Sequence, residues 1–474
     1  MKNKTELNRR DFVKQGLCGA TGLFLLPTLL QSAAAQAILR SDLKSLRKSP
    51  LDDDPHFFLM ITLPNASGVD ASYLWDARPL SMTASNLIQN YRNVDPETWT
   101  GTNGVSTLST DIVRPLRTYQ SDFTVLNGVM MDVGFDGHEQ NINYLFTGDP
   151  FGGECFLPHL NMAANRKPLD ALEWGRYGVT QTNGSQIVPL NPSSARSLVV
   201  SLSKVSAVDP STKLMQYLSN RFTSLGQAPG GFSASSATMA KAFQQMPGLS
   251  QMLSQIQTDG SDTIPGFIGL LGQVFSLGAA KGAILVLDPA DNIYDSHDPV
   301  SASKQPKSSA DLVRQLSTVI SSLKSTAYDS SRSLMDVTTF MFSSEFGRTM
   351  RQLNNPIDKT GTDHNPLSNT VIVGGKGIKN GQVLGSSDFN SADEVLSQAH
   401  LSLDPTRVKC VSRPYDFANG ISRTDLPAAF QASDYLSISS VMNTIYNMFN
   451  VPQNKWRLIE RNGAVAPVLK HLVS

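Results

Sequence analysis

Short apolar runs, rich in β-branched and aromatic residues, recur along the chain between longer amphipathic stretches. Runs of about four to eight such residues predict buried strands, whereas apolar positions spaced three and four apart predict helices. We expect strands at 56–63, 123–129, 198–202, 283–287, 337–342 and 370–375. We expect helices at 310–323 and 434–449.

The alternation of strands and helices predicts an α/β fold with a mainly parallel sheet, flanked by helices on both faces. The segment from about 205 to 275 differs, because it is rich in Ser, Gly, Gln and Met and contains short helical patterns. We interpret this segment as a helical insertion in the main domain and as a candidate lid over the functional site expected at the strand ends.

The amino terminus has the pattern of an export signal. Arg9-Arg10 precedes an apolar stretch at 17–30, which small residues follow up to Ala35-Gln36-Ala37. This order predicts a twin-arginine signal peptide over residues 1–37 and a mature α/β domain over 38–474. The mature protein is then expected to be periplasmic or secreted.

A membrane anchor is the alternative interpretation of the same segment. It is weaker, because the apolar run is shorter than the roughly 20 residues of a membrane span and contains Gly22 and Pro27. We expect no membrane contact once the signal is removed. The twin-arginine route carries folded proteins, so it permits a metal to be inserted before export.

Composition limits the partners. The chain has 40 basic and 40 acidic residues, and such a balance does not favour nucleic acid or anionic lipid. Cys18 leaves with the signal, and two cysteines remain, Cys155 and Cys410. Two alternatives stay open for them, a disulfide formed in an oxidising compartment and two separately buried thiols.

Histidines and carboxylates gather near the ends of predicted strands. Asp295 and His297 follow the strand at 283–287, and His138 follows the strand at 123–129. Asp363 and His364 form a second Asp-His pair, just before the last predicted strand. Asp and His together suit zinc, manganese or a similar divalent ion. We therefore expect these side chains to converge on a metal site.

Glu345 and Arg348 follow the strand at 337–342 and have two interpretations. They could form an ion pair that holds a loop, or Arg348 could offer its planar fork to a phosphate, sulfate or carboxylate. Asp70, after the first strand, fits a helix N-cap as well as a metal ligand.

Taken together, the motifs resemble a known family. They are the segment 345–349, the pair Asp363-His364, the glycine-rich run 374–385, the loop 294–297 and the block from 125 to 148. Their order is similar to that of the exported bacterial proteins grouped as domain of unknown function family 1501, which are similar to the alkaline phosphatase and sulfatase superfamily. The resemblance extends from about residue 55 to 450.

The resemblance implies an alkaline-phosphatase-like sheet whose strand ends hold one or two divalent metals, either zinc, manganese, calcium or magnesium. It implies a first metal cluster of Asp295, His297 and His364. Asp70, Glu345 and Asp363 would then bind a second ion or support the first.

The resemblance also implies an enzyme that hydrolyses phosphate or sulfate esters, in which Arg348 holds the non-reacting oxygens. Gly137 stands where the family usually has the serine nucleophile, and 65–71 departs from the usual Gly-Gly-x-Asp-Gly loop. A hydrolase would then use His138 as the nucleophile, or water activated by the metal. The alternative is a non-catalytic member of the fold that binds an anionic small molecule or glycan, or a protein partner exported with it.

Overall fold

The computed structural model of the chain describes residues 54–63, 75–76, 96–131, 134–135, 137–161, 171–175, 187–189, 191–193, 195–196, 256–257, 260–288, 294–348, 351–352, 363–388, 407–408, 411–425, 427, 431–459 and 463–474. The predicted signal peptide, the predicted strand at 198–202, Asp70, Cys410 and most of the expected insertion lie outside these residues. None of the described helices combines the length and the apolar character that crossing a membrane requires.

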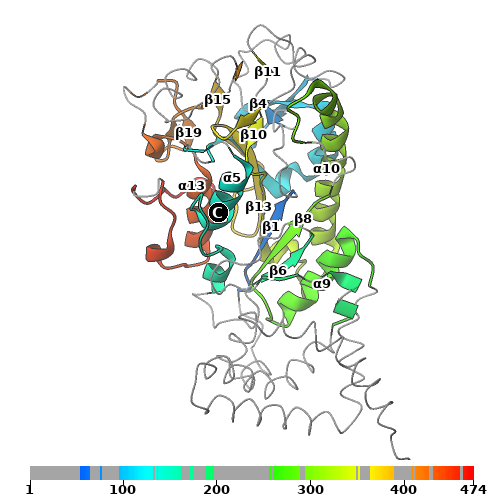
Figure 1. Ribbon diagram of the computed structural model, residues 1–474. Helices are drawn as coiled ribbons and strands as arrows, with labels where there is room; N and C mark the ends of the chain where they lie inside the picture. The colour runs from blue at the N-terminus through cyan, green and yellow to red at the C-terminus, as the bar shows by residue number, and fades with distance from the viewer. Residues whose placement is uncertain are drawn as a thin grey trace, which may run out of the picture.

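An eight-stranded sheet runs through the centre of the described part of the chain (Figure 1). All neighbouring strands are parallel except β13, which runs antiparallel to β9 on one side and to β5 on the other. The predicted α/β class with a mainly parallel sheet is therefore confirmed. The strand order is β14 (Val383–Leu384), β5 (Phe123–Val129), β13 (Asn369–Gly375), β9 (Thr338–Phe342), β1 (Phe57–Thr62), β8 (Gly282–Val286), β6 (Ala171–Trp174) and β7 (Ile187–Pro189).

Both faces of the sheet are buried, as its central strand β1 shows. Side chains alternate along a strand, so Phe57, Leu59 and Ile61 enter one hydrophobic core while Phe58 and Met60 enter the other. All six residues of β1 are buried. A strand buried on both sides reads as a continuous apolar run, which is why the sequence revealed it.

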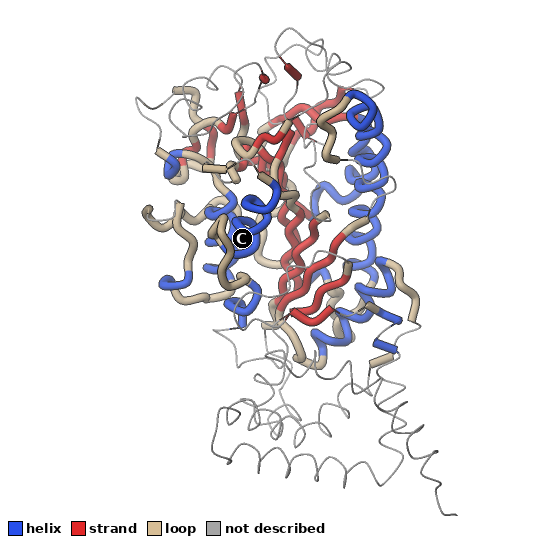
Figure 2. Tube along the Cα trace, viewed as in Figure 1, coloured by secondary structure: helices blue, strands red, loops and turns tan. Residues whose placement is uncertain are grey.

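Helices cover the two faces, as predicted (Figure 2). The first core takes apolar residues from η2, α9 and α10, and the second from α5, η3 and α13. Short 3-10 helices η4, η5 and η6 complete the set. The bounds are η2 (Asp111–Asp122), α5 (His138–Thr147), η3 (Leu157–Asn161), α9 (Ile264–Ser276), α10 (Pro299–Ser325), η4 (Met335–Val337), η5 (Ala432–Asp434), α13 (Ile438–Met448) and η6 (Gln453–Lys455).

Capping explains where two helices differ from the predicted bounds. α10 begins well before the predicted residue 310, because Asp298 accepts hydrogen bonds from two backbone amides of the first turn and Pro299 suits the first helical position. α13 begins after the predicted residue 434, because the Ser437 side chain accepts from the amide of Ser440. Apolar periodicity alone locates neither cap.

Strand direction determines which loops meet. β1, β8 and β9 are parallel, and β5 has the same direction because β13 is antiparallel to both β5 and β9. The carboxyl ends of these strands therefore share one edge of the sheet with the amino end of β13, and ligand sites of α/β sheets form at such edges.

The remaining strands form small sheets: β2 (Trp75–Asp76) with β4 (Ser106–Thr110) and β3 (Pro96–Thr100), β10 (Gly347–Arg348) with β12 (His364–Asn365), β11 (Arg351–Gln352) with β16 (Arg407–Val408), β15 (Ser387–Asp388) with β17 (Val411–Ser412), and β18 (Tyr415–Asp416) with β19 (Ile421–Ser422).

Candidate metal centre

The loop after β8 presents Asp295 and His297 on the same side. Tyr294 and Ser296 are fully buried, whereas the side chains of Asp295 and His297 are each 42% exposed. Residues two apart in an extended segment point the same way, so burial of one pair turns the other outward. α10 holds the buried pair, because the side-chain amide of Gln305 donates to the Tyr294 carbonyl and to the Ser296 hydroxyl.

His364 and Arg348 face each other across the two-stranded β10–β12 pair, in which Arg348 is in register with His364. The neighbouring Gly347 leaves room for the segment that follows β12, because a Cβ atom there would lie 2.2 Å from the Ser368 carbonyl oxygen. The glycine of the sequence motif thus allows the backbone of Ser368 to approach closely.

His138 is the first residue of α5, and it comes to the same edge from the end of β5. The ring of the fully buried Phe346 lies against the imidazoles of both His138 and His364, with centroids 4.9 and 4.5 Å away. Phe346 therefore restrains two histidines that are distant in sequence. No sequence motif indicates the roles of Phe346 and Gln305, because their contacts with His138, His364 and the 294–296 loop exist only in the folded chain.

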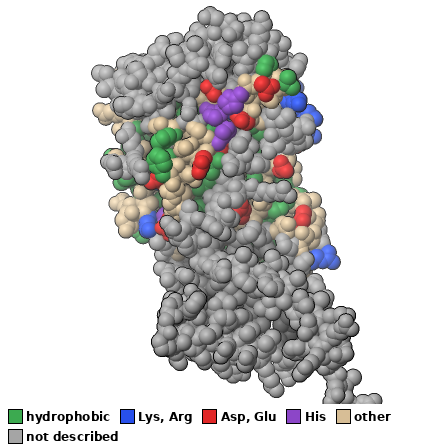
Figure 3. Space-filling model, viewed as in Figure 1, with side chains coloured by type: hydrophobic (Ala, Val, Ile, Leu, Met, Phe, Trp, Pro, Cys, Tyr) green, Lys and Arg blue, Asp and Glu red, His purple; other side chains and the backbone are tan. Residues whose placement is uncertain are grey.

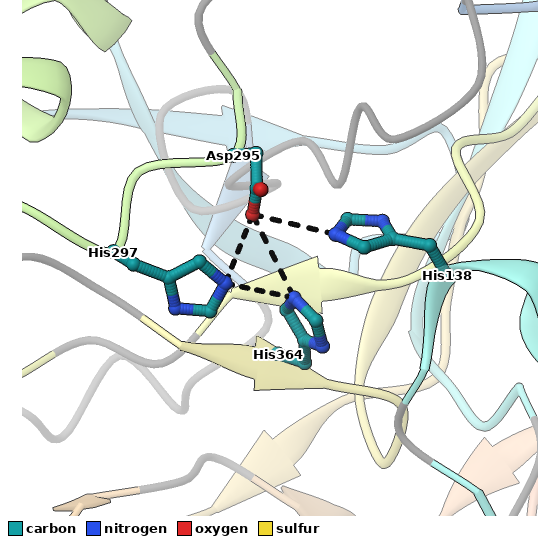
Figure 4. A group of neighbouring side chains, drawn as sticks. All are labelled: His138, Asp295, His297 and His364. Carbon is teal, nitrogen blue, oxygen red and sulfur yellow. Dashed lines mark hydrogen bonds and ion pairs between the residues drawn. The ribbon is translucent and has the colours of Figure 1, made fainter.

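The three histidines direct the same atom toward one carboxylate oxygen (Figure 4). The Nε2 atoms of His297, His138 and His364 lie 3.0, 3.3 and 3.7 Å from Asp295 Oδ1. The Nε2 atoms of His297 and His364 are 3.0 Å apart. One donor atom from each of the four residues lies within 4.8 Å of all the others. A group of histidine side chains is visible on the surface, with acidic side chains around it (Figure 3).

Further charged groups surround these four side chains. Glu345 Oε1 contacts His138 Nδ1, and Asp363 Oδ1 lies 3.5 Å from His297 Nδ1. Arg348, whose side chain is fully buried, donates from Nη1 to Asp295 Oδ1 at 3.1 Å. The arginine therefore faces the histidine cluster. Of the residues that the sequence nominated, the structure brings together His138, Asp295, His297, Glu345, Arg348, Asp363 and His364, while Asp70 lies outside the described residues.

Burial and charge displace the pKa values of this group. Burial raises the pKa of Glu345, although His138 acts against it. Burial by itself lowers the pKa of His138, but the hydrogen bond and charge of Glu345 outweigh it and the pKa rises. Burial would raise the pKa of Asp295, but Arg348 and the histidines lower it. Asp295 is therefore a carboxylate at neutral pH.

The donor set fits a divalent transition metal. Imidazole nitrogen and carboxylate oxygen are zinc ligands, and a tetrahedral ion about 2.0 to 2.1 Å from its ligands separates their atoms by about 3.3 Å. The contacts of 3.0 to 3.7 Å around Asp295 Oδ1 are close to that separation. In addition, His138 Nε2 is buried and makes no hydrogen bond within the described part of the chain.

The chain is an α/β protein with a cluster of His and Asp side chains at the strand ends of its sheet. The profile of the family described as "Protein of unknown function (DUF1501)" matches residues 288–403, a span that contains Asp295, His297, Glu345, Arg348, Asp363 and His364. This match confirms the resemblance of the motifs to that family over residues 288–403. The matched span begins at residue 288 and therefore does not include His138.

Two solved structures are similar to this chain at low sequence identity and low TM-score. The zinc complex of the C-terminal periplasmic domain of EcEptC from Escherichia coli is 9% identical, with a TM-score of 0.35 over 89% of each chain. The lipoteichoic acid synthase LtaP from Listeria monocytogenes is 9% identical, with a TM-score of 0.29 over 79% of each chain. No curated protein matches the chain in sequence.

Proposed function

We propose that this protein is an exported, metal-dependent hydrolase of phosphate or sulfate esters. The observation that carries the proposal is the convergence of three imidazole Nε2 atoms on Asp295 Oδ1, beside the buried guanidinium of Arg348. Transition-metal ligands next to a buried cation suit a substrate that carries negative charge. The predicted signal peptide supports a periplasmic or secreted location.

His138, Asp295, His297 and His364 would hold the ion. Three nitrogen donors favour zinc over manganese, calcium and magnesium, which suit oxygen ligands better. When bound, the metal would polarise the ester and lower the pKa of water at the site.

Arg348 would bind the non-reacting oxygens of the ester. Its Nη1 atom already contacts the carboxylate that lies among the histidines, so an anion in the same place meets the guanidinium. Burial strengthens such a contact, because no water competes for the donor.

Water is the nucleophile that we infer. Gly137 supplies no hydroxyl at the start of α5, so a covalent seryl intermediate cannot form there. His138 directs its Nε2 atom into the cluster, and one lone pair cannot both hold an ion and attack an ester. We therefore assign His138 to metal binding rather than to nucleophilic attack.

The absence of a hydroxyl at Gly137 also favours a second candidate function. In that alternative the protein is a non-catalytic member of the fold, and its metal and Arg348 bind an anionic glycan or a co-exported partner without turnover. The two functions share the metal centre and differ in catalysis.

Metal analysis and turnover separate these functions. Protein purified from the periplasm would be analysed for zinc, manganese, calcium and magnesium, then assayed with 4-nitrophenyl phosphate and 4-nitrophenyl sulfate. Hydrolysis that a chelator abolishes, that zinc or manganese restores and that His364→Ala removes would support the hydrolase. Stoichiometric metal without turnover of either ester would favour the binding protein, and protein that takes up no metal would refute both.

A further inference from the structure

Glu345 lies behind the histidine cluster rather than within it. It follows β9, its side chain is 1% exposed, and Oε1 contacts Nδ1 of His138. Among the described residues, the donor atoms that gather within 4.8 Å of one another come from other side chains. The position of Glu345 thus differs from that of a ligand to this ion. Of the two roles that the resemblance implied for it, binding a second ion or supporting the first, it fits support.

We propose that Glu345 is a positioning residue, whose carboxylate fixes the tautomer and the ring orientation of His138 for metal binding. The proposal rests on the proposed metal centre. A proton on Nδ1 is donated to Glu345 Oε1, so the lone pair remains on Nε2, the atom that lies 3.3 Å from Asp295 Oδ1. Carboxylate partners orient metal-binding histidines in this way.

The burial of Glu345 is hard to explain by stability alone. Its second oxygen, Oε2, is buried and has no hydrogen-bond partner within the described part of the chain. A buried carboxylate oxygen without a partner costs free energy of folding. An apolar side chain would fill the same place without that cost, so the carboxylate is explained by what it does to His138.

Asp363 provides a matched comparison within the same site. It also approaches the Nδ1 atom of a cluster histidine, His297, but at 3.5 Å, and its side chain is 22% exposed. Water can replace an exposed partner, whereas it has little access to Glu345. Loss of the Glu345 carboxylate should therefore affect metal binding more than loss of the Asp363 charge.

Calorimetric titration with zinc chloride tests the role of Glu345 in the mature protein. Glu345→Met removes the acceptor and should weaken zinc binding about 10- to 100-fold, the range found for outer-shell partners. Glu345→Gln keeps an oxygen that accepts from Nδ1 and should retain most of the affinity. Asp363→Asn is the control, and it should lower the zinc affinity less than Glu345→Met does. Circular dichroism checks that each variant is folded.

Two results of the titration would overturn the proposal. Zinc affinity unchanged in Glu345→Met would show that the carboxylate does not position His138. A loss in Glu345→Gln as complete as the loss in His138→Ala would show that Glu345 is itself a ligand.

Nitrogen NMR of the histidine rings tests the inference without any metal. In metal-free protein at alkaline pH, His138 should carry its proton on Nδ1, and Glu345→Met should remove this preference. A proton on Nε2 in the wild type would overturn the proposal even if the variants fail to fold. If the wild type shows the expected tautomer but binds no zinc, the metal centre is refuted while the control of His138 by Glu345 stands.

Discussion

The Nε2 atoms of His297 and His364 lie 3.0 Å apart, although 67 residues separate them in the chain. Two neutral imidazoles can share one proton at this distance, and two protonated ones would repel each other. The same separation suits two ligands of one small cation. We therefore expect these two histidines to be the first part of the described structure that changes when a metal is added.

Zinc should stabilise the folded protein. A ligand that binds only the native state at a hundredfold excess over its Kd adds about 2.7 kcal/mol to the free energy of unfolding. Denaturant unfolding with and without zinc would measure the gain, which should disappear in His297→Ala and in His364→Ala. Equal stabilisation of both variants by zinc would place the ion elsewhere.

Arg348→Ala should separate catalysis from metal binding. Loss of a hydrogen bond to a charged group costs about 1.5 to 3 kcal/mol, roughly a ten- to hundredfold drop in kcat/KM if the contact forms in the transition state. Zinc affinity should not fall, because the variant removes a cation that competes for Asp295. Kinetics and calorimetry on the same preparation would show the split, and a parallel loss of zinc would contradict it.

Serine at residue 137 should be tolerated. Gly137 has φ −77° and ψ 151°, which any residue adopts, and an added Cβ would meet only the flexible tip of Gln140. Serine is also a better helix N-cap by a few tenths of a kcal/mol. We expect Gly137→Ser to unfold at the same denaturant concentration or slightly above, and to preserve or raise ester hydrolysis.

Gly347→Ala is the contrasting variant. Its Cβ would collide with the backbone of Ser368, which cannot rotate away as a side chain can. A loss of about 1 to 3 kcal/mol or more in the free energy of unfolding is expected. Equal stability of the Gly137 and Gly347 variants would argue against the close approach of the Ser368 backbone to Gly347.

His56 should make stability depend on pH. Burial, with Lys376 and Lys281 nearby, lowers its pKa from 6.5 to about 4, although Asp54 acts in the opposite direction. Between these two values the unfolded chain binds the proton and the folded chain does not, so stability falls as pH falls from 6.5 to about 4. The contribution is about 3 kcal/mol at most.

Denaturant titrations of the wild type and His56→Gln across this pH range would measure the effect of His56. Glutamine can keep the hydrogen bond to Thr339 but does not titrate. The difference in free energy of unfolding between the two proteins should therefore change with pH. A constant difference would show that His56 titrates alike in both states.

Export remains a prediction from the sequence, since the first 53 residues lie outside those that the structure describes. Replacing Arg9 and Arg10 together by lysine should leave the precursor in the cytoplasm, because the twin-arginine route requires the pair. Cell fractionation and immunoblotting would measure the distribution. A normal periplasmic yield of the double variant would refute the route.

Much of the fold was determined by local pattern. Strands such as β5 (Phe123–Val129) and β9 (Thr338–Phe342) are buried on both faces, so they appear in the sequence as nearly continuous apolar runs. The Asp-His pairs were recognisable because few residue types bind metals and these stand beside such runs. Local sequence therefore predicted the α/β class and most of the candidate residues.

Only the tertiary structure decided how these residues meet. The direction of β13 is antiparallel to its neighbours, and this brings His364, which precedes β13, to the edge where Asp295 follows β8. An apolar run reads the same in either direction, so periodicity cannot supply that information. The separate roles of Glu345, behind His138, and Arg348, beside Asp295, likewise depend on where neighbouring side chains point at the end of β9. That choice arises from packing between segments far apart in the chain, which no local pattern encodes.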